Sequence, residues 1–368
     1  MNRSEIIENS VINEGNIARF HAAFKKAEAK EPMTIGFIGG SITQGALSST
    51  IETCYAYLVL KWWQEKFPLT SFTYVNAGIG ATTSQFGVAR VESDLLSYEP
   101  DVVFLEFSVN DSLELKYFET FEGIVRKILT YKKQPALFMF NNVCYDTGMN
   151  AQAIHNRIGK HYDLPIVSMK SSIYKAMLDG TYQTKELTLD NLHPNDKGHR
   201  LIADLLIHLL EQINEKAKTV KEVFQPFLPQ PISPNRYYHS MRYNQKNSNP
   251  KLDGFVPDLS TQVHVSDVFK NGWTASCIGD CITFEVTGTM IAIQYRRTIN
   301  KPAPVAEVMI DGEVVLTLDA NFNETWGDCL SLQDVLIAGE DTLHTVTVRI
   351  IKAENIKSDF YLASIITA

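Results

Sequence analysis

The chain has 368 residues, of which 45% are hydrophobic, and it carries a formal net charge of −8 at pH 7. It is too long for one ordinary flavodoxin-sized domain, and its apolar content is enough to bury the cores of two domains. The negative charge, with no basic stripe, argues against a nucleic-acid partner, and the lack of an apolar signal-peptide core or of a long apolar run predicts a cytoplasmic protein with no membrane partner.

The N-terminal part of the chain alternates between helical and strand patterns. An amphipathic helix is predicted at residues 15–30, and the first strand begins at Met33. Further helical patterns fall at residues 53–67, 84–98, 116–132, 150–162 and 195–217, with strands near residues 72, 102, 136 and 165. This alternation predicts a parallel sheet that is covered by helices on both faces.

A glycine pair and a serine follow the first predicted strand. Gly39 and Gly40 allow a tight strand-to-helix turn that would strain a residue with a Cβ, and the turn places Ser41 at the carboxyl edge of the strand. An α/β sheet presents a nucleophile in this way. Small-residue loops after a strand also cradle phosphates or are plain turns, so Ser41 alone does not identify the chemistry.

A histidine close to a carboxylate lies far downstream, in the segment Asp190-Asn191-Leu192-His193. A serine hydroxyl attacks an ester at neutral pH only when a base removes its proton, and we predict that His193 is this base. Asp190 can reach the other ring nitrogen, fix the tautomer and stabilise the imidazolium that forms. The alternative is that Asp190 only makes a turn while His193 starts a helix, but this leaves the pairing with Ser41 unexplained.

Two further strand ends carry hydrogen-bond donors. The buried strand that begins at Asp101 leads to Asn110, whose side chain can donate an N–H, and the strand from Thr73 leads into a small-residue loop that contains Gly80. We expect these donors to converge near Ser41 as an oxyanion hole, which stabilises the tetrahedral intermediate of acyl transfer.

These four motifs, in this order, resemble the blocks of the SGNH hydrolase superfamily, also called GDSL-like esterases, over residues 33–215. The resemblance implies a flavodoxin-like, three-layer α/β fold with Ser41 as nucleophile and Asp190 with His193 completing the triad. It also implies that the backbone N–H of Ser41, the N–H of Gly80 and the side chain of Asn110 donate to the oxyanion. The N–H of Ala81 is an alternative to that of Gly80.

The sequence departs from the family pattern at two blocks. The nucleophile block reads Gly-Gly-Ser-Ile in place of Gly-Asp-Ser-Leu, and Ser108 stands where the family usually has glycine. Neither change removes a catalytic group.

The pattern changes after Leu210. Prolines recur in a connector that cannot be helical, and we predict a catalytic domain at residues 1–224 and a second domain at residues 225–368. From Trp273 onward, short alternating strands follow one another, and Asp311-Gly312 is a two-residue hairpin signal. An all-β sandwich is expected, similar to the jelly-roll carbohydrate-binding modules attached to carbohydrate-active enzymes.

The same patterns predict roles for several single residues. Trp326 lies in a polar loop, so it is the candidate for stacking on a sugar ring, although a core position is an alternative; Trp273 is assigned to the core. His155 has no carboxylate at a meaningful spacing and receives a structural role, and Glu106 is expected to pair with Arg90.

The cysteines show no disulfide framework. Five are present, and they are predicted to be reduced and mostly buried thiols. A zinc site at Cys277, Cys281 and Cys329 is disfavoured because no fourth ligand is evident.

The resemblance implies a serine esterase that needs no metal or organic cofactor. A catalytic domain followed by a sandwich resembles carbohydrate esterase family 17, the acetyl-mannan esterases, and implies an acetylated oligosaccharide as substrate, imported if the protein is cytoplasmic. An acetyl-xylan esterase, a lipase or thioesterase, a nucleotide-binding module and a non-catalytic sugar-binding protein are the alternatives. The oligomeric state is open, and a homo-oligomer is compatible with the sequence.

Overall fold

The computed structural model describes residues 1–219 and 227–368. The chain divides into two compact units, Met1–Tyr238 and His239–Ala368. The boundary predicted between residues 224 and 225, together with Pro226 of the connector, lies outside the described residues, so its placement stays a prediction.

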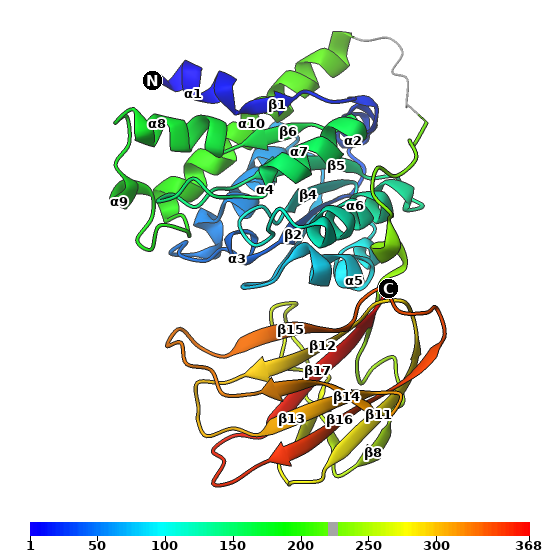
Figure 1. Cartoon of the computed structure of the whole chain (residues 1–368). Helices are drawn as coiled ribbons and strands as arrows, with labels where there is room; N and C mark the ends of the chain where they lie inside the picture. Colours follow the sequence, from blue (N-terminus) through cyan, green and yellow to red (C-terminus); the bar gives the residue numbers. More distant parts are fainter. Residues whose placement is uncertain (220–226) are drawn as a thin grey trace. The chain divides into compact units, whose positions relative to one another are not determined.

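The first unit is built from alternating helices and strands (Figure 1). Its helices are α1 (Arg3–Ser10), α2 (Ala18–Glu28), α3 (Ser41–Gln44), α4 (Tyr55–Lys66), α5 (Ser84–Asp94), α6 (Leu115–Thr130), α7 (Gln152–His161), α8 (Lys175–Leu178), α9 (Thr184–Leu187) and α10 (Asp196–Thr219). Its strands are β1 (Val11–Asn13), β2 (Met33–Gly39), β3 (Phe72–Gly78), β4 (Val102–Glu106), β5 (Ala136–Asn141) and β6 (Ile166–Ser168). The predicted helices and parallel strands are confirmed, whereas α1 and β1 were not predicted.

The strands of this unit form one sheet in the order β1-β6-β5-β4-β2-β3. All neighbouring pairs are parallel except β1 with β6, which is antiparallel. The order reverses at β2, because β3 lies on one side of it and β4 on the other. A doubly wound sheet of this kind forms its crevice outside the carboxyl ends of the strands at the reversal point.

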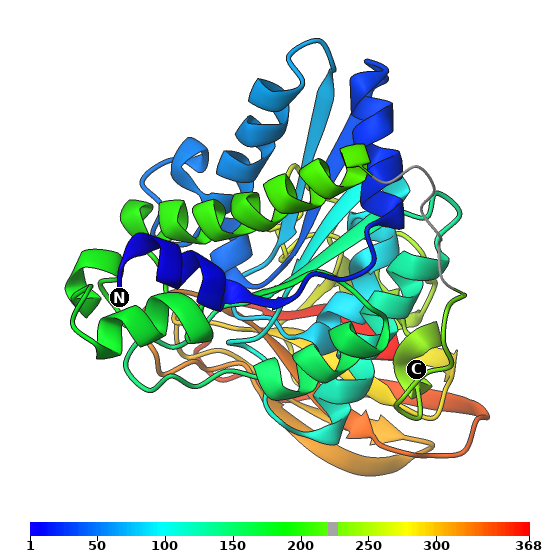
Figure 2. The same cartoon turned by 90° about the horizontal axis from the view of Figure 1, so that it is seen from above.

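Helices cover both faces of the sheet (Figure 2). On one face α10 packs on α2 and α4, and on the other α6 packs on α5 and α7. Three phenylalanines in register on adjacent strands anchor the first face. The rings of Phe37 and Phe104 are stacked with centroids 4.8 Å apart, and Phe104 and Phe138 follow at 5.3 Å. This core fixes the edge at which β2, β3 and β4 end.

The second unit contains only strands and loops besides one short 3-10 helix at its start. The strands are β7 (Met241–Tyr243), β8 (Lys251–Asp253), β9 (Val256–Pro257), β10 (Trp273–Ala275), β11 (Cys281–Thr287), β12 (Ile291–Arg297), β13 (Val305–Ile310), β14 (Glu313–Asp319), β15 (Cys329–Leu336), β16 (Leu343–Lys352) and β17 (Phe360–Thr367). They form two antiparallel sheets, β15-β12-β17-β10-β9 with β7 on β17, and β14-β13-β16-β11-β8. The predicted all-β sandwich is therefore confirmed.

Two of the local predictions for the sandwich are confirmed by the structure. Trp273 is 1% exposed and packs edge-to-face on Phe284 of the opposite sheet, as its assignment to the core requires. Asp311 and Gly312 both have positive φ, 53° and 90°, and join β13 to β14 as a tight hairpin. This backbone conformation favours the Asp-Gly pair.

The prediction of mostly buried cysteines is wrong. All five cysteines are free, but only Cys54 is buried, and Cys277 is exposed. Within the described residues, no group of three or more His, Cys, Asp or Glu side chains is arranged to hold a metal ion, and no helix has the length and hydropathy to cross a membrane.

Candidate active site

Three strand ends meet where the candidate residues lie. Ser41 begins α3 directly after β2, Gly80 follows β3, and Asn110 follows β4. The strands are in register there, with Gly39 of β2 opposite Gly78 of β3 on one side and Glu106 of β4 on the other. The reversal point of the sheet thus brings together residues that are far apart in the sequence.

The glycine pair before Ser41 relieves crowding and not backbone strain. Gly40 has φ −88° and ψ −151°, an extended conformation that any residue can adopt. A Cβ on Gly40 would lie 2.3 Å from Asn110 Oδ1, and one on Gly39 would lie 2.2 Å from Thr43 Oγ1. A Cβ at either position is therefore unfavourable, as predicted, but the cause is contact with neighbouring side chains and not the backbone conformation. The glycines are needed because the nucleophile turn and the Asn110 loop approach each other closely.

Ser41, His193 and Asp190 form one hydrogen-bonded chain. Ser41 Oγ lies 2.8 Å from His193 Nε2, and His193 Nδ1 lies 2.6 Å from Asp190 Oδ2. The second carboxylate oxygen of Asp190 accepts from the backbone N–H of His193 at 2.8 Å and of Leu192 at 3.0 Å. This loop geometry explains the Asp-x-x-His spacing, since it orients the carboxylate towards the imidazole.

The electrostatics of the loop keep Asp190 ionised. Partial burial alone would raise the pKa of Asp190, but the hydrogen bonds from the His193 ring and from the two backbone N–H groups outweigh it and lower the pKa to about 2. With Nδ1–H donated to a carboxylate, the Nε2 atom that faces Ser41 is the proton acceptor. The arrangement suits a base that takes the serine proton.

The proposed oxyanion donors lie beside Ser41. The backbone N–H of Ser41 is the first of α3 and has no acceptor within the helix. A Cβ built on Gly80 would lie 3.6 Å from Ser41 Cβ, so this glycine borders the nucleophile. Its N–H donates to Gln44 Oε1 at 2.7 Å. The sequence carried no signal for Gln44, and the choice between Gly80 and Ala81 stays a prediction.

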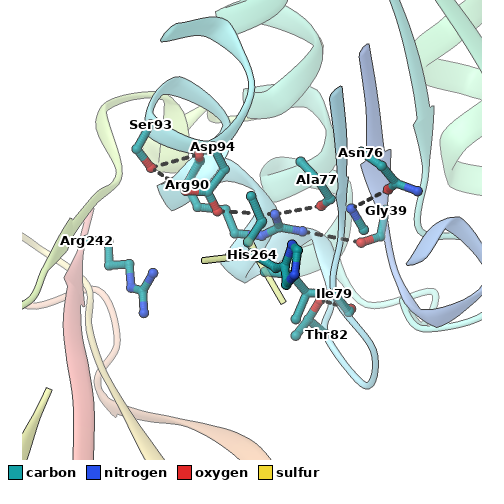
Figure 3. Close-up of polar contacts among 12 residues, drawn as sticks. Gly39, Asn76, Ala77, Ile79, Thr82, Arg90, Ser93, Asp94, Arg242 and His264 are labelled. Atoms are coloured by element: carbon teal, nitrogen blue, oxygen red, sulfur yellow. Dashed lines mark hydrogen bonds and ion pairs between the residues drawn. The ribbon is translucent and has the colours of Figure 1, made fainter. Parts of the chain in front are cut away.

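Two polar side chains, one partly and one fully buried, hold the strand ends in place. Asn76 donates to the Thr43 carbonyl oxygen at 2.7 Å and accepts from the Gly78 N–H at 2.9 Å, which ties α3 to the end of β3. Arg90 of α5, fully buried, donates to the carbonyl oxygens of Ala77 at 2.7 Å and Gly39 at 3.3 Å (Figure 3). The guanidinium therefore joins the ends of β2 and β3 directly behind the candidate site.

The expected pairing of Glu106 with Arg90 is wrong. Arg90 pairs with Asp94 at 3.4 Å on its own helix. Glu106 Oε1 lies instead 2.6 Å from the Ser108 N–H and 2.5 Å from its hydroxyl. Burial raises the pKa of Glu106, against the lowering effect of these hydrogen bonds. Ser108, the departure from the usual glycine, is thus a partner of this carboxyl group.

A second carboxylate–histidine pair supports Asn110. Asp111 Oδ2 lies 3.1 Å from His155 Nε2, both side chains are fully buried, and Asp111 Oδ1 accepts from the Ser84 N–H at the start of α5 at 2.9 Å. The His155 ring stacks on Phe121 with centroids 3.6 Å apart. His155 therefore has a carboxylate partner, and spacing along the chain could not reveal a pair separated by so many residues.

Trp326 lies in the second unit, in the loop between β14 and β15. It is 60% exposed and packs edge-to-face on Phe322, whose ring carries the Arg297 guanidinium 4.8 Å from its centroid. The core alternative for Trp326 is therefore excluded. More than half of the Trp326 surface is therefore accessible to a ligand.

The chain is similar to a known protein family and to solved structures. The model of the GDSL-like Lipase/Acylhydrolase family matches residues 37–201. A crystal structure of a two-domain esterase (CEX) active on acetylated mannans is 48% identical, covers 98% of each chain and has a TM-score of 0.94. The structure of such an esterase co-crystallised with mannopentaose is also 48% identical, covers 98% of this chain and 97% of that chain, and has a TM-score of 0.93.

The match to a more distant relative covers about half of this chain. Thioesterase 1/protease 1/lysophospholipase L1 of Escherichia coli (strain K12) is 27% identical over 218 residues, which are 55% of this chain and 98% of the relative.

Proposed function

The chain belongs to the GDSL-like lipase and acylhydrolase family, and from this premise we propose that it is a serine carbohydrate esterase that removes O-acetyl groups from mannan-derived oligosaccharides. The observation that carries the proposal is the hydrogen-bonded chain from Ser41 Oγ through His193 to Asp190. The 48% identity to an esterase active on acetylated mannans, over 98% of each chain, supports the substrate.

The first half of the reaction forms an acetyl-enzyme. Ser41 Oγ attacks the acetyl carbonyl carbon while His193 Nε2 takes the hydroxyl proton, and Asp190 stabilises the imidazolium. The negative charge on the carbonyl oxygen is stabilised by the N–H groups of Ser41 and Gly80 and by the Asn110 amide. His193 then gives its proton to the departing sugar oxygen, which leaves as a hydroxyl.

The second half returns the enzyme to its starting state. A water molecule loses a proton to His193 and attacks the acetyl carbon, and the bond to Ser41 Oγ breaks as His193 returns the proton to that oxygen. Acetate leaves, and no metal or organic cofactor enters any step.

Acetyl release tests both the reaction and the sugar. Acetylated mannan and xylan oligosaccharides are incubated with wild-type protein and with Ser41→Ala, and the loss of acetyl groups is followed by mass spectrometry. We expect acetyl groups to be lost from the mannan oligosaccharides with wild-type protein and not with Ser41→Ala. Preferential loss from xylan would favour the acetyl-xylan alternative, and equal activity of Ser41→Ala would reject the serine mechanism.

A lipase or thioesterase is the second candidate, because the E. coli relative is named for such activities. The two candidates differ in the acyl group. Nitrophenyl esters of acetate and of long-chain acids separate them: activity on the long-chain ester that exceeds activity on the acetate would favour the second candidate.

We also propose a cytoplasmic location, which cell fractionation tests.

Trp326 is proposed to stack on a sugar ring of the substrate. We expect Trp326→Ala to raise KM for acetylated mannopentaose about 10-fold, since the contact of a sugar ring with an aromatic face contributes on the order of 1 kcal/mol or more. KM for 4-nitrophenyl acetate should not change. Ile337→Ala is the matched control, since Ile337 is 64% exposed on the loop after β15. Equal KM values for Trp326→Ala and wild type on the pentasaccharide would contradict a sugar-binding role for Trp326.

A further inference from the structure

Gln44 holds one of the donors that the proposed reaction needs. It is the last residue of α3, one turn after the nucleophile, and its side chain is exposed. Its Oε1 atom accepts from the Gly80 N–H at 2.7 Å. A Cβ on Gly80 would lie 3.1 Å from this oxygen and 3.6 Å from Ser41 Cβ. The amide oxygen and the nucleophile therefore lie on the same side of Gly80.

A single backbone N–H makes one good hydrogen bond, so Gln44 and the acyl oxygen compete for Gly80. The amide of Gln44 must present its oxygen to the Gly80 N–H, because its NH₂ group is a donor and cannot accept this hydrogen bond. A carbonyl oxygen that arrives with the substrate is a neutral acceptor of the same kind. When the carbonyl oxygen of the substrate replaces the Gln44 oxygen, the free energy therefore changes little until the substrate oxygen becomes charged.

We propose that Gln44 is the resting-state ligand of the oxyanion hole, which the acyl oxygen of the substrate or the carboxylate of the product displaces from the Gly80 N–H. The inference deepens the proposed function and rests on it for the role of Gly80. The exposed side chain can rotate away without disturbing the core. Every ligand that uses the Gly80 donor must first displace Gln44, and this includes acetate after hydrolysis.

The proposal predicts two effects of equal size. The ratio kcat/KM is measured from free enzyme and substrate, so it contains the full free energy of displacing Gln44. The dissociation constant of acetate contains the same contribution. Gln44→Met removes the competing oxygen and keeps the length of the side chain. We expect it to raise kcat/KM for 4-nitrophenyl acetate by about 2- to 12-fold and to tighten acetate binding by the same factor, the range that one net hydrogen bond gives.

Gln44→Glu should have the opposite effect. A carboxylate accepts from the Gly80 N–H more strongly than an amide does, and it places a negative charge where the oxyanion forms. We expect kcat/KM to fall by more than about 10-fold at pH 8. The ratio of variant to wild-type kcat/KM should rise as the pH is lowered towards about 4.5, because an unperturbed glutamate protonates near pH 4.3.

The experiment combines steady-state kinetics with an NMR titration of acetate on wild type, Gln44→Met, Gln44→Glu and the control Gln333→Met. Gln333 is exposed on β15 of the other unit, so its replacement should change neither quantity. Thermal unfolding midpoints verify that the variants fold.

The outcomes separate the two proposals. A rise in kcat/KM with tighter acetate binding in Gln44→Met supports the displacement, and a merely structural glutamine could not produce it. A fall in kcat/KM, or unchanged acetate binding, would overturn it. Acetate binding requires no turnover, so it tests Gln44 even if Ser41→Ala proved as active as wild type and the esterase proposal failed.

Discussion

Replacing Gly40 by alanine tests whether Asn110 acts as an oxyanion donor. The extended backbone at Gly40 accepts an alanine, so the only new contact that matters is steric. The added Cβ would lie 2.3 Å from Asn110 Oδ1, whereas real Cβ atoms essentially never approach another atom closer than 3.0 Å. The Asn110 amide must therefore retreat by about 0.7 Å or more.

The size of the effect follows from this displacement. A misplacement of about 1 Å in a catalytic group lowers the rate about 10²-fold, and removing one oxyanion donor lowers kcat by about 10²–10³-fold. We expect Gly40→Ala to lower kcat for 4-nitrophenyl acetate by about 10²-fold with little change in KM, because the donor acts on charge that develops in the transition state. The unfolding midpoint should stay nearly constant, since the end of a side chain and not the backbone has to move.

A double-mutant cycle identifies the amide as the cause. If Gly40→Ala acts by displacing Asn110, the double variant with Asn110→Ala should be no slower than Asn110→Ala alone. Steady-state kinetics on the four proteins measure this. Full kcat in Gly40→Ala, or losses that multiply in the double variant, would refute the reasoning. The usual aspartate of the family also carries a Cβ at this position, so the expected loss depends on where Asn110 lies in this chain.

Three further predictions address the supporting groups. Asp190→Asn should lower kcat by about 10³–10⁴-fold in steady-state assays, because the imidazole loses the carboxylate that fixes its tautomer; a loss below tenfold would contradict that role. Asp111→Ala should lower the free energy of unfolding by about 2–5 kcal/mol in urea titrations, since it leaves the buried Ser84 N–H and the His155 ring without an acceptor; wild-type stability would contradict it. Burial lowers the pKa of His199 from 6.5 to about 4, so the unfolded chain binds the proton more readily between these pH values and wild-type stability falls as the pH drops through this window. His199→Gln should remove on the order of 3 kcal/mol of that fall in unfolding experiments at pH 7 and pH 4, whereas an unchanged fall would contradict the assignment.

The fold could be predicted from the sequence because each element carries a local signal. The apolar strands around Phe37, Phe104 and Phe138 are buried on both faces and read as continuous hydrophobic runs, and the helices between them are amphipathic. The Asp311-Gly312 pair is a strong local signal for a two-residue hairpin turn. Strand β1 escaped prediction because three residues at a sheet edge give no periodicity.

The candidate site could be predicted only in part. Ser41, Asp190 and His193 lie in motifs that point to their chemistry, and the structure places them within hydrogen-bonding distance. Gln44 and the pair of Asp111 with His155 could not be found in this way, because each contact joins segments that only the folded sheet brings together. The intolerance of a Cβ at Gly40 could be predicted, but its cause could not, since the group that requires glycine there, Asn110, belongs to a different loop.

The acid and base members of the site lie on one short turn of the chain. Main-chain groups within four consecutive positions fix the carboxylate of Asp190 against the ring of His193, with no help from the sheet. Because these bonds are local, substitutions elsewhere in the unit that leave this turn in place should leave the contact between Asp190 and His193 intact. The sheet then has to supply what this turn lacks, which is the serine oxygen within reach of the ring nitrogen and the hydrogen-bond donors at the ends of the neighbouring strands.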